Sequence, residues 1–283
     1  MSHRFTQVDV FSASPTRGNA LAVVHDADGM TDEQMAAFAR WTNLSETTFL
    51  LKPTAPDADY RVRIFTPLQE LPFAGHPTLG SCHAWLEAGR KAGGDQVVQQ
   101  CGAGLIEVRL EGDRLAFKAP PLVRSGAVEP DILAKALDGT GLTPADVVEA
   151  AWVDNGPGWM GLLLRSSVDV LAIKPDFQLL KGMRVGVIGP VEKGSKMGYD
   201  FEVRGFTAAG FEDAATGSLN AGLAVWLTGT GHAPDRYVAA QGTMIGRKAR
   251  LHVTRDGSEI WLGGHCHTVI SGRIDLETDT TAS

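Results

Sequence analysis

The chain has 283 residues and a formal net charge of -7, and 43% of its residues are hydrophobic. This composition is typical of a globular protein and argues against disorder. The acidic balance and the lack of a basic run argue against nucleic acid or a membrane surface as a partner. No apolar run is long enough to span a bilayer, and the first residues do not resemble a signal peptide.

The three cysteines are Cys82, Cys101 and Cys266, and they form no CxxC pair. An odd number of widely spaced cysteines in a chain of this length favours reduced thiols. We therefore expect a cytoplasmic protein.

The chain opens with a predicted hairpin. Phe5–Phe11 and Ala20–His25 have the pattern of strands, and a turn rich in Ser, Pro and Gly separates them. Asn19 stands where the second strand begins. Two interpretations stay open for it: a residue that shapes the turn, or a polar contact to a ligand.

A helix and a strand follow the hairpin. Thr31–Gln34 is a capping-box signature, and the apolar residues after it have helical spacing, which predicts a helix over about 31–42. A short turn then leads to an apolar strand over 48–51. Glu46 lies in that turn. It is either a solvated turn residue or a carboxylate directed into a cleft, where desolvation would raise its pKa towards the range useful for proton transfer.

The next segment reads as strand, turn and helix. Tyr60–Thr66 is the strand, Leu71–Gly80 contains the turn, and a helical run continues to about Gly89. The turn places His76 at the N-terminus of the helix, where unpaired N–H groups and the helix dipole suit an anion such as a carboxylate. The alternative is an ordinary strand–turn–helix with a surface histidine.

The same pattern recurs in the second half of the chain. At an offset of 141 residues identical residues coincide, among them Arg63 with Arg204, Phe65 with Phe206 and Trp85 with Trp226. Such a register indicates a tandem duplication of one unit, with a period too long for a solenoid. We therefore predict two similar lobes whose helix N-termini, at 75–78 and 216–218, face one cleft.

Each lobe is expected to be α+β, with a curled and mostly antiparallel sheet or barrel around a central helix. The second central helix, Ser218–Thr228, is apolar nearly all round and therefore needs burial inside its lobe. A segment rich in proline over 119–130 predicts a linker, so the lobes should span residues 1–120 and 121–283. The strand predicted near 268–276 is a candidate to pack back on the first lobe.

Three further predictions concern the second half. We expect a strand over 169–173, a short helix over 177–182 and a polar, frayed tail from Glu277. His265 and His267 would share a face of a strand and could meet a metal ion, but no further ligand lies close in sequence. The sequence therefore favours a site without metal.

Four separated motifs carry a resemblance to a known family. They are Gly18-Asn19, Leu44-Ser-Glu46-Thr, Leu71-Pro-Phe-Ala-Gly-His76-Pro-Thr and Glu212-Asp213-Ala-Ala-Thr-Gly217-Ser218. In this order and over essentially the whole chain, they resemble the phenazine-biosynthesis PhzF-like isomerases, which share the diaminopimelate-epimerase fold.

The resemblance implies an active site between the lobes, no metal or organic cofactor, and a homodimer. Glu46 matches the family's acid/base carboxylate, and His76 and Asp213 match polar residues beside the substrate. The residues that match those holding a substrate carboxylate and its surroundings are Asn19, Gly75, Gly217 and Ser218.

One comparison within the fold narrows the expected reaction. The racemases and epimerases of this fold use two cysteines, one at each helix N-terminus, whereas this chain has Ala74 and Ala214 near those positions. One carboxylate, Glu46, is then the obvious proton carrier. We expect a cofactor-independent isomerase that moves a proton on a small carboxylate-bearing substrate. Dihydro-hydroxyanthranilate-type compounds are one candidate class of substrate. The alternative is a catalytically silent member of the fold that binds a ligand or a protein.

Overall fold

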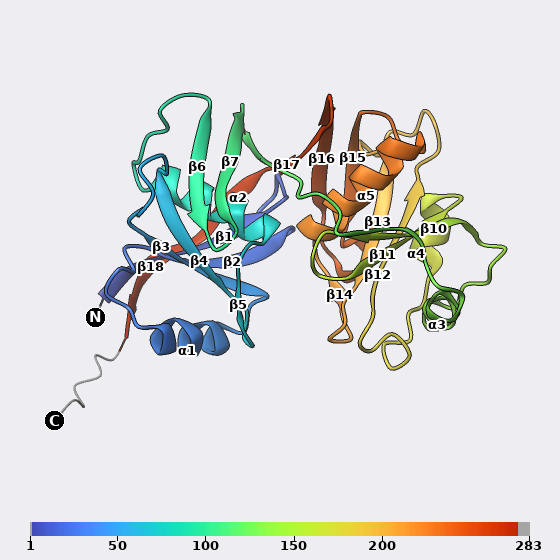
Figure 1. The fold of residues 1–283 in the computed structure, drawn as a ribbon, viewed down its shortest axis with the longest axis horizontal. Helices are drawn as coiled ribbons and strands as arrows, with labels where there is room; N and C mark the ends of the chain where they lie inside the picture. The colour runs from blue at the N-terminus through green and yellow to red at the C-terminus, as the bar shows by residue number, and fades with distance from the viewer. Residues whose placement is uncertain (1, 277–283) are drawn as a thin grey trace. The chain divides into compact units, whose positions relative to one another are not determined.

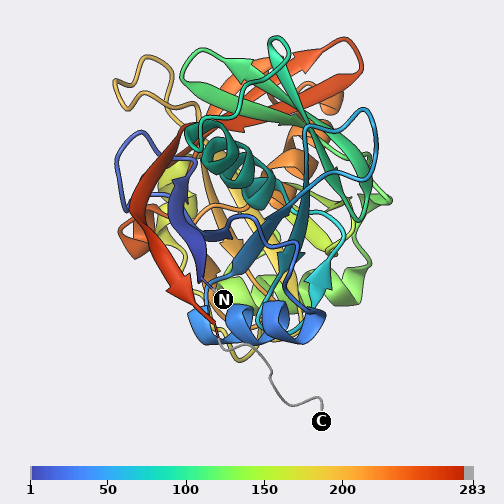
Figure 2. The same cartoon turned by 90° about the vertical axis from the view of Figure 1, so that its left-hand side faces the viewer.

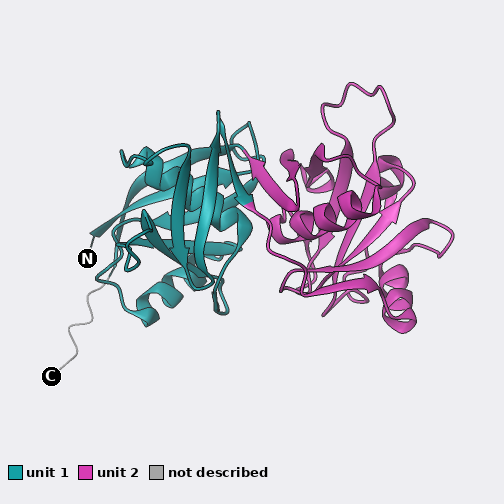
Figure 3. Cartoon of the chain, turned by 45° about the horizontal axis from the view of Figure 1, so that its top comes forward, with its two compact units in different colours: residues 1–117, 265–283 teal, residues 118–264 magenta. Residues whose placement is uncertain are grey.

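A computed structural model describes residues 2–276, and the chain divides into two compact units. Unit 1 takes residues 1–117 and 265–283, and unit 2 takes residues 118–264 (Figure 3). The predicted boundary after residue 120 lies close to the end of the first segment of unit 1 at Phe117. The strand predicted near 268–276, a candidate to pack back on the first lobe, lies in unit 1. The tail predicted from Glu277 lies outside the described residues. No helix in the described part of the chain has the length and hydropathy to cross a membrane.

Unit 1 is a mixed sheet with two helices (Figure 1). Its elements are β1 (Ser2–Val10), β2 (Asn19–Val24), α1 (Asp32–Thr42), β3 (Glu46–Leu51), β4 (Tyr60–Phe65), β5 (Glu70–Leu71), α2 (Gly75–Glu87), β6 (Gln96–Cys101), β7 (Gly104–Glu111), β8 (Arg114–Lys118) and β18 (Cys266–Asp275). The strands pair in the order β18-β1-β2-β3-β4-β6-β7-β8, and the short β5 pairs with β4. The pairs β2–β3 and β4–β6 are parallel, and the others are antiparallel.

Unit 2 has three α-helices and one 3₁₀ turn. Its elements are β9 (Arg124–Ala127), α3 (Pro130–Thr140), β10 (Val147–Asp154), β11 (Trp159–Leu164), α4 (Ser167–Ala172), β12 (Arg184–Pro190), β13 (Phe201–Phe206), β14 (Glu212–Asp213), α5 (Gly217–Thr230), β15 (Arg236–Gln241), η1 (Thr243–Ile245), β16 (Ala249–Asp256) and β17 (Glu259–Gly264). The strands pair in the order β9-β10-β11-β12-β13-β15-β16-β17, with β14 on β13.

The two units therefore repeat one topology. In unit 2 the parallel pairs are β11–β12 and β13–β15, at the same places in the order as β2–β3 and β4–β6 in unit 1. The predicted pair of similar lobes is confirmed. The repeat has one permutation: β9 starts unit 2 in sequence, but its equivalent in unit 1 is β18, which comes from the end of the chain.

A central helix fills each unit. In unit 1, α2 packs against strands from several parts of the sheet that surrounds it (Figure 2). In unit 2, α5 packs against β10, β11, β16 and β17. A glycine at the same place in each helix allows this close approach. A Cβ on Gly80 would meet Leu21 Cδ2 at 2.6 Å, and one on Gly222 would meet the Val153 carbonyl oxygen at 2.1 Å.

Further helices cover the outer faces of the two sheets. Helix α1 begins at the predicted capping box of Thr31 and Gln34, and it buries Met35 and Phe38 against the sheet of unit 1. Helices α3 and α4 bury Leu137 and Val170 against the sheet of unit 2. Each sheet therefore has an apolar layer on both sides, which fixes the strand ends that carry the candidate site.

Three predicted elements of unit 2 are wrong. The linker expected over 119–130 contains β9, which pairs antiparallel with β10. All residues of β9 are exposed, so this strand has no alternation of apolar and polar residues to reveal it. The strand expected over 169–173 is helix α4, whose start is capped by Ser166 accepting from the Asp169 N–H. The helix expected over 177–182 is a series of turns.

Candidate active site

Glu46 and His76 lie together in unit 1. Oε2 of Glu46 is 3.4 Å from Nε2 of His76, and the two side chains are 17% and 7% exposed. Nε2 of His76 is buried and makes no hydrogen bond within the described residues. Glu46 and His76, which the sequence named as separate candidates, therefore lie in one compact group.

The turn after α1 positions Glu46. The helix ends at Asn43, which takes the left-handed conformation with φ of 54° and directs the chain back towards the sheet. The Thr42 and Thr47 hydroxyls, 2.8 Å apart, hold the two sides of the turn together. Glu46 then begins β3 opposite Leu21 in a parallel ladder, which fixes its backbone against β2.

The start of α2 positions His76. Ala74 caps the helix in an extended conformation with no side-chain hydrogen bond, so no side chain occupies the first N–H groups of the helix. Further along α2, the Ser81 hydroxyl donates to Thr48 Oγ1 of β3 at 2.9 Å. This bond ties the helix that carries His76 to the strand that begins with Glu46.

Burial sets the charge of His76. Desolvation lowers the pKa of its imidazole to about 3, because the charged form loses its hydration inside the unit. His76 is therefore neutral at pH 7. A neutral imidazole beside a carboxylate can donate or accept a hydrogen bond without neutralising the carboxylate's charge.

Asn19 is presented by the loop between β1 and β2. The Asp9 carboxylate accepts from the backbone N–H groups of Arg17 and Gly18, both at 2.8–2.9 Å to Oδ2. A Cβ on Gly18 would lie 2.0 Å from the Val10 carbonyl oxygen, so only glycine fits there. The buried Asn19 follows as the first residue of β2, two positions before the strand partner of Glu46.

In unit 2, Asp213 organises the start of α5. One carboxylate oxygen accepts from the Ala214 N–H at 2.8 Å and the other accepts from the Thr216 hydroxyl at 2.6 Å. The carboxylate thus shapes the turn before Gly217 and Ser218. Thr216 itself is the N-cap of α5 and makes no side-chain cap to the helix.

Gln241 braces the same turn from β15. Its side-chain oxygen accepts from the Thr216 N–H at 3.0 Å and from Asn220 Nδ2 at 2.8 Å. Its side-chain nitrogen donates to the Asp213 carbonyl oxygen and to Thr216 Oγ1. Gln241 coincides with Gln100 at the repeat's offset of 141 residues, but the sequence alone gives neither residue a role.

Ser218 is held by the loop between β10 and β11. Trp159 Nε1 donates to Ser218 Oγ at 3.0 Å, and Asn155 Nδ2 donates to the Ser218 carbonyl oxygen at 2.9 Å. Neither contact was predicted from the sequence. The sequence from Asp154 to Gly158 does indicate a turn, but it does not indicate that this turn contacts Ser218.

The structure thus forms two groups of predicted site residues, one in each unit. Unit 1 brings together Glu46, His76 and Gly75, and unit 2 brings together Asp213, Gly217 and Ser218. The two groups start from equivalent places, because His76 and Ser218 are each the second residue of a central helix.

Of the two histidines considered for a metal, His265 contacts a carboxylate, and Nε2 of His267 is buried without a hydrogen bond within the described residues. His265 Nδ1 is 3.4 Å from the Asp113 carboxylate. Within residues 2–276, no group of three or more His, Cys, Asp or Glu residues is arranged to hold a metal ion.

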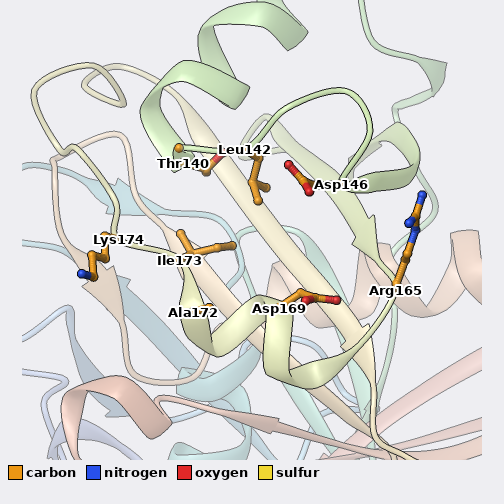
Figure 4. A pocket seen from close by; sticks show the side chains of 9 residues that line it. Thr140, Leu142, Asp146, Arg165, Asp169, Ala172, Ile173 and Lys174 are labelled. Atoms are coloured by element: carbon orange, nitrogen blue, oxygen red, sulfur yellow. The ribbon is translucent and has the colours of Figure 1, made fainter.

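A separate groove of about 460 Å³ lies in unit 2 (Figure 4). It is lined by residues from the end of α3, from α4 and from the segments beside them, including Leu142, Asp146, Arg165 and Ile173. Two of its charged groups have local partners: Asp146 accepts from Thr143, and Arg165 donates to the Ala145 carbonyl oxygen. None of the predicted site residues lines this groove.

Comparison with known proteins identifies the family. Residues 8–272 match the family model described as phenazine biosynthesis-like protein. The chain is 36% identical to antisense-enhancing sequence 1 of Schizosaccharomyces pombe, over 96% of this chain and 98% of that protein. It is 33% identical to trans-2,3-dihydro-3-hydroxyanthranilate isomerase of Pseudomonas aeruginosa, over 90% of this chain and 91% of that protein.

The fold agrees with this assignment. A PhzF-family protein of Enterococcus faecalis has a crystal structure that superposes with a TM-score of 0.81, at 23% identity, covering 98% of this chain and all of that one. The predicted epimerase-like architecture is therefore confirmed. The chain belongs to the phenazine biosynthesis-like family and is an isomerase of the PhzF type.

Proposed function

We propose that this isomerase moves a proton on a small carboxylate-bearing substrate, with Glu46 as the single general acid and base. The observation that carries the proposal is the 3.4 Å approach of the Glu46 carboxylate to the buried, neutral imidazole of His76. A carboxylate at the edge of a buried helix N-terminus can exchange protons with a bound C–H group while little water reaches it.

The proposed reaction is an allylic proton shift. The Glu46 carboxylate takes a proton from an activated carbon, and the electron pair left behind forms a new double bond to the neighbouring carbon. The existing double bond shifts its electrons to the far carbon. That carbon then receives the proton from the Glu46 carboxylic acid, which returns to a carboxylate, so neither atoms nor charge are gained or lost.

His76 stabilises the same reaction by hydrogen bonding. Because its imidazole is neutral at pH 7, it can donate to the electron-rich system that develops during the shift without trapping it as an ion pair. General acid–base assistance of this kind is typically worth roughly 10²- to 10⁴-fold in rate.

The substrate carboxylate binds at the N-terminus of a central helix. Gly75 and Gly217 begin the two central helices, and neither helix has a side-chain cap on its first N–H groups. Such groups bind anions. We propose that Asn19 contributes to a substrate's surroundings in unit 1. In unit 2 we propose that Ser218 offers a donor at the start of α5, with Asp213 acting through the turn that it shapes.

The relatives suggest the first substrate to try. One of them is named trans-2,3-dihydro-3-hydroxyanthranilate isomerase, so this compound is the probe. In D₂O, proton NMR of the wild-type reaction should show deuterium entering the substrate carbon skeleton. Glu46→Gln keeps the size of the side chain but cannot carry the proton, and it should lower the exchange rate by at least 10³-fold.

Glu107→Gln is the matched control, since Glu107 is an exposed glutamate of β7 in the same unit. It should exchange at the wild-type rate. Full exchange in Glu46→Gln would remove Glu46 from the mechanism. No exchange in the wild type with this compound or with a panel of unsaturated amino and hydroxy acids would favour the ligand-binding alternative.

We also propose a cytoplasmic homodimer. The described cysteines are free, and burial raises the pKa of the Cys82 thiol to about 12, which keeps that sulfur protonated and unreactive. Light scattering coupled to size exclusion, with and without reductant, should give the mass of two chains in both cases. A monomer mass would contradict the dimer.

A further inference from the structure

Trp159 opens β11 of unit 2, and Asn19 opens β2 of unit 1. The two strands take the same place in the pairing order of their units, and each of the two residues follows a glycine. The loop before it is shaped in the same way. Asp9 accepts from the Gly18 N–H, and Asp154 accepts from the N–H groups of Gly156 and Gly158 at 2.7 and 2.6 Å. The duplicated fold therefore presents a polar side chain from equivalent loops.

The side chain presented in unit 2 is an indole. Trp159 is 3% exposed, so packing fixes the ring. Its Nε1–H donates to Ser218 Oγ, and the neighbouring Asn155 donates to the Ser218 carbonyl oxygen. The loop thus contacts both the backbone and the hydroxyl of the second residue of α5.

This contact determines what the Ser218 hydroxyl can do. An indole N–H can only donate, and a serine hydroxyl has one proton and two lone pairs. Since one lone pair accepts from Trp159, the hydroxyl proton must point elsewhere. Among the described residues, Ser218 Oγ has no acceptor for that proton, and the residue is only partly buried.

We infer that Trp159 is a positioning residue that commits Ser218 to donate to an acceptor oxygen of the substrate, which makes this end of α5 selective for a carboxylate. The inference rests on the proposed function, since it assumes that Ser218 contacts the substrate. It adds Trp159, which ends the loop between β10 and β11, to the residues that the proposed function uses. It also explains why a buried tryptophan has its only polar atom directed at the helix N-terminus.

The test is a double-mutant cycle on ligand binding. The probe is 3-hydroxyanthranilate, the aromatic analogue with no proton to shift, and the proteins are wild type, Trp159→Phe, Ser218→Ala and the double variant. Loss of one hydrogen bond should weaken binding roughly 3- to 10-fold in Trp159→Phe. In the Ser218→Ala background the same change should alter the Kd by less than about twofold, because the hydroxyl it orients is gone.

Trp152→Phe is the matched control. Trp152 is also a buried tryptophan of unit 2, and its Nε1 donates to Glu129 rather than to α5. This variant should keep the wild-type Kd. With a turned-over substrate, Trp159→Phe should raise KM and leave kcat within about twofold, since the carboxylate contact is the same in the ground state and the transition state.

A direct readout uses the indole N–H resonance of Trp159, assigned by its loss in Trp159→Phe. It should shift upfield in Ser218→Ala, where the hydrogen bond is absent. An unchanged resonance, or equal weakening by Trp159→Phe in both backgrounds, would overturn the inference.

The outcomes separate this inference from the proposed function. Glu46→Gln should bind 3-hydroxyanthranilate about as well as the wild type while losing proton exchange. If Glu46→Gln still exchanges protons but the binding cycle shows coupling, the mechanism fails and the positioning role stands. If the wild type shows no saturable binding of 3-hydroxyanthranilate, both the substrate class and the role of Trp159 are wrong.

Discussion

At the scale of single residues, burial rather than residue type decides what the candidate site can do. His76 and His25 both lie inside unit 1, and desolvation lowers the pKa of His76 to about 3 and that of His25 to about 4. His25 has a hydroxyl partner, Thr6, at 2.7 Å. Nε2 of His76 has no hydrogen bond within the described residues and lies beside Glu46. The His25 ring therefore has a hydrogen-bond partner, whereas Nε2 of His76 has none within the described residues.

The lowered pKa of His76 makes stability depend on pH. Between about pH 3 and 6.5 the unfolded chain binds a proton at this residue and the folded chain does not, so folding is disfavoured as the pH falls. The penalty grows by about 1.4 kcal/mol for each pH unit below 6.5. His76→Gln cannot take the proton and should lack this contribution.

Urea unfolding at pH 7, 6 and 5 measures the effect. The free energy of unfolding should fall more steeply with acidification in the wild type than in His76→Gln, while both retain the contribution of His25. Parallel curves would show that His76 is not buried in its neutral form.

At the scale of elements, the duplication gives one ion pair in two environments. Arg63 and Glu70 join β4 to β5, and Arg204 and Glu212 join β13 to β14. Each pair brackets the turn that leads to a central helix, and each is bidentate. The side chains of the first pair are 23% and 41% exposed, and those of the second are 3% and 5% exposed.

Burial should make the same substitution cost different amounts. Glu212→Gln leaves the Arg204 charge buried with only carbonyl partners, Val170 and Ile173, and should cost about 3–5 kcal/mol of stability. Glu70→Gln leaves Arg63 with Asp32 in a solvated place and should cost about 1 kcal/mol or less.

Denaturant midpoints of the two variants, measured side by side, compare the two pairs directly. Because the pairs occupy equivalent turns, local geometry is matched and the difference reports burial. Equal losses of stability would mean that the turn, and not the desolvated charge, sets the cost.

At the scale of the whole molecule, unit 1 is built from both ends of the chain. Strand β18 pairs with β1 along its length, and Ser2 lies opposite Asp275. Unit 2 is continuous in sequence, with β9 before β10. Strand β18 thus pairs with β1 in unit 1 as β9 pairs with β10 in unit 2.

A circular permutant tests this topology. Joining residue 283 to residue 1 and starting the chain at His265 makes unit 1 continuous and keeps every residue. Because β18 and β1 already run antiparallel with their ends paired, the permutant should fold, with a thermal midpoint within a few degrees of the wild type and with proton exchange retained.

The control is a chain that stops at Gly264 and lacks β18. It should lose amide protection in β1 and α2, which β18 contacts, while the amides of unit 2 stay protected. Wild-type protection of β1 in this truncated chain would contradict the role assigned to β18.

The sequence alone determined the features that local patterns encode. The capping box at Thr31 fixed the start of α1, the identities at an offset of 141 revealed the duplicated topology, and the apolar run after Ser218 required a buried helix. The motifs around Glu46 and His76 also supplied the candidate site residues of unit 1, whose roles stay predictions. These signals are detectable because helix spacing, turn residues and repeats each leave a short-range pattern.

Only the tertiary structure decided the contacts between residues distant in sequence. Strand β9 has no apolar alternation, and pairing with β10 alone makes it a strand. The place of β18 in unit 1 depends on a ladder between the two ends of the chain, and the Trp159 contact with Ser218 joins a loop to a helix 59 residues away. Backbone pairing and side-chain orientation across such separations depend on how the sheet closes around its helix, which no local pattern specifies.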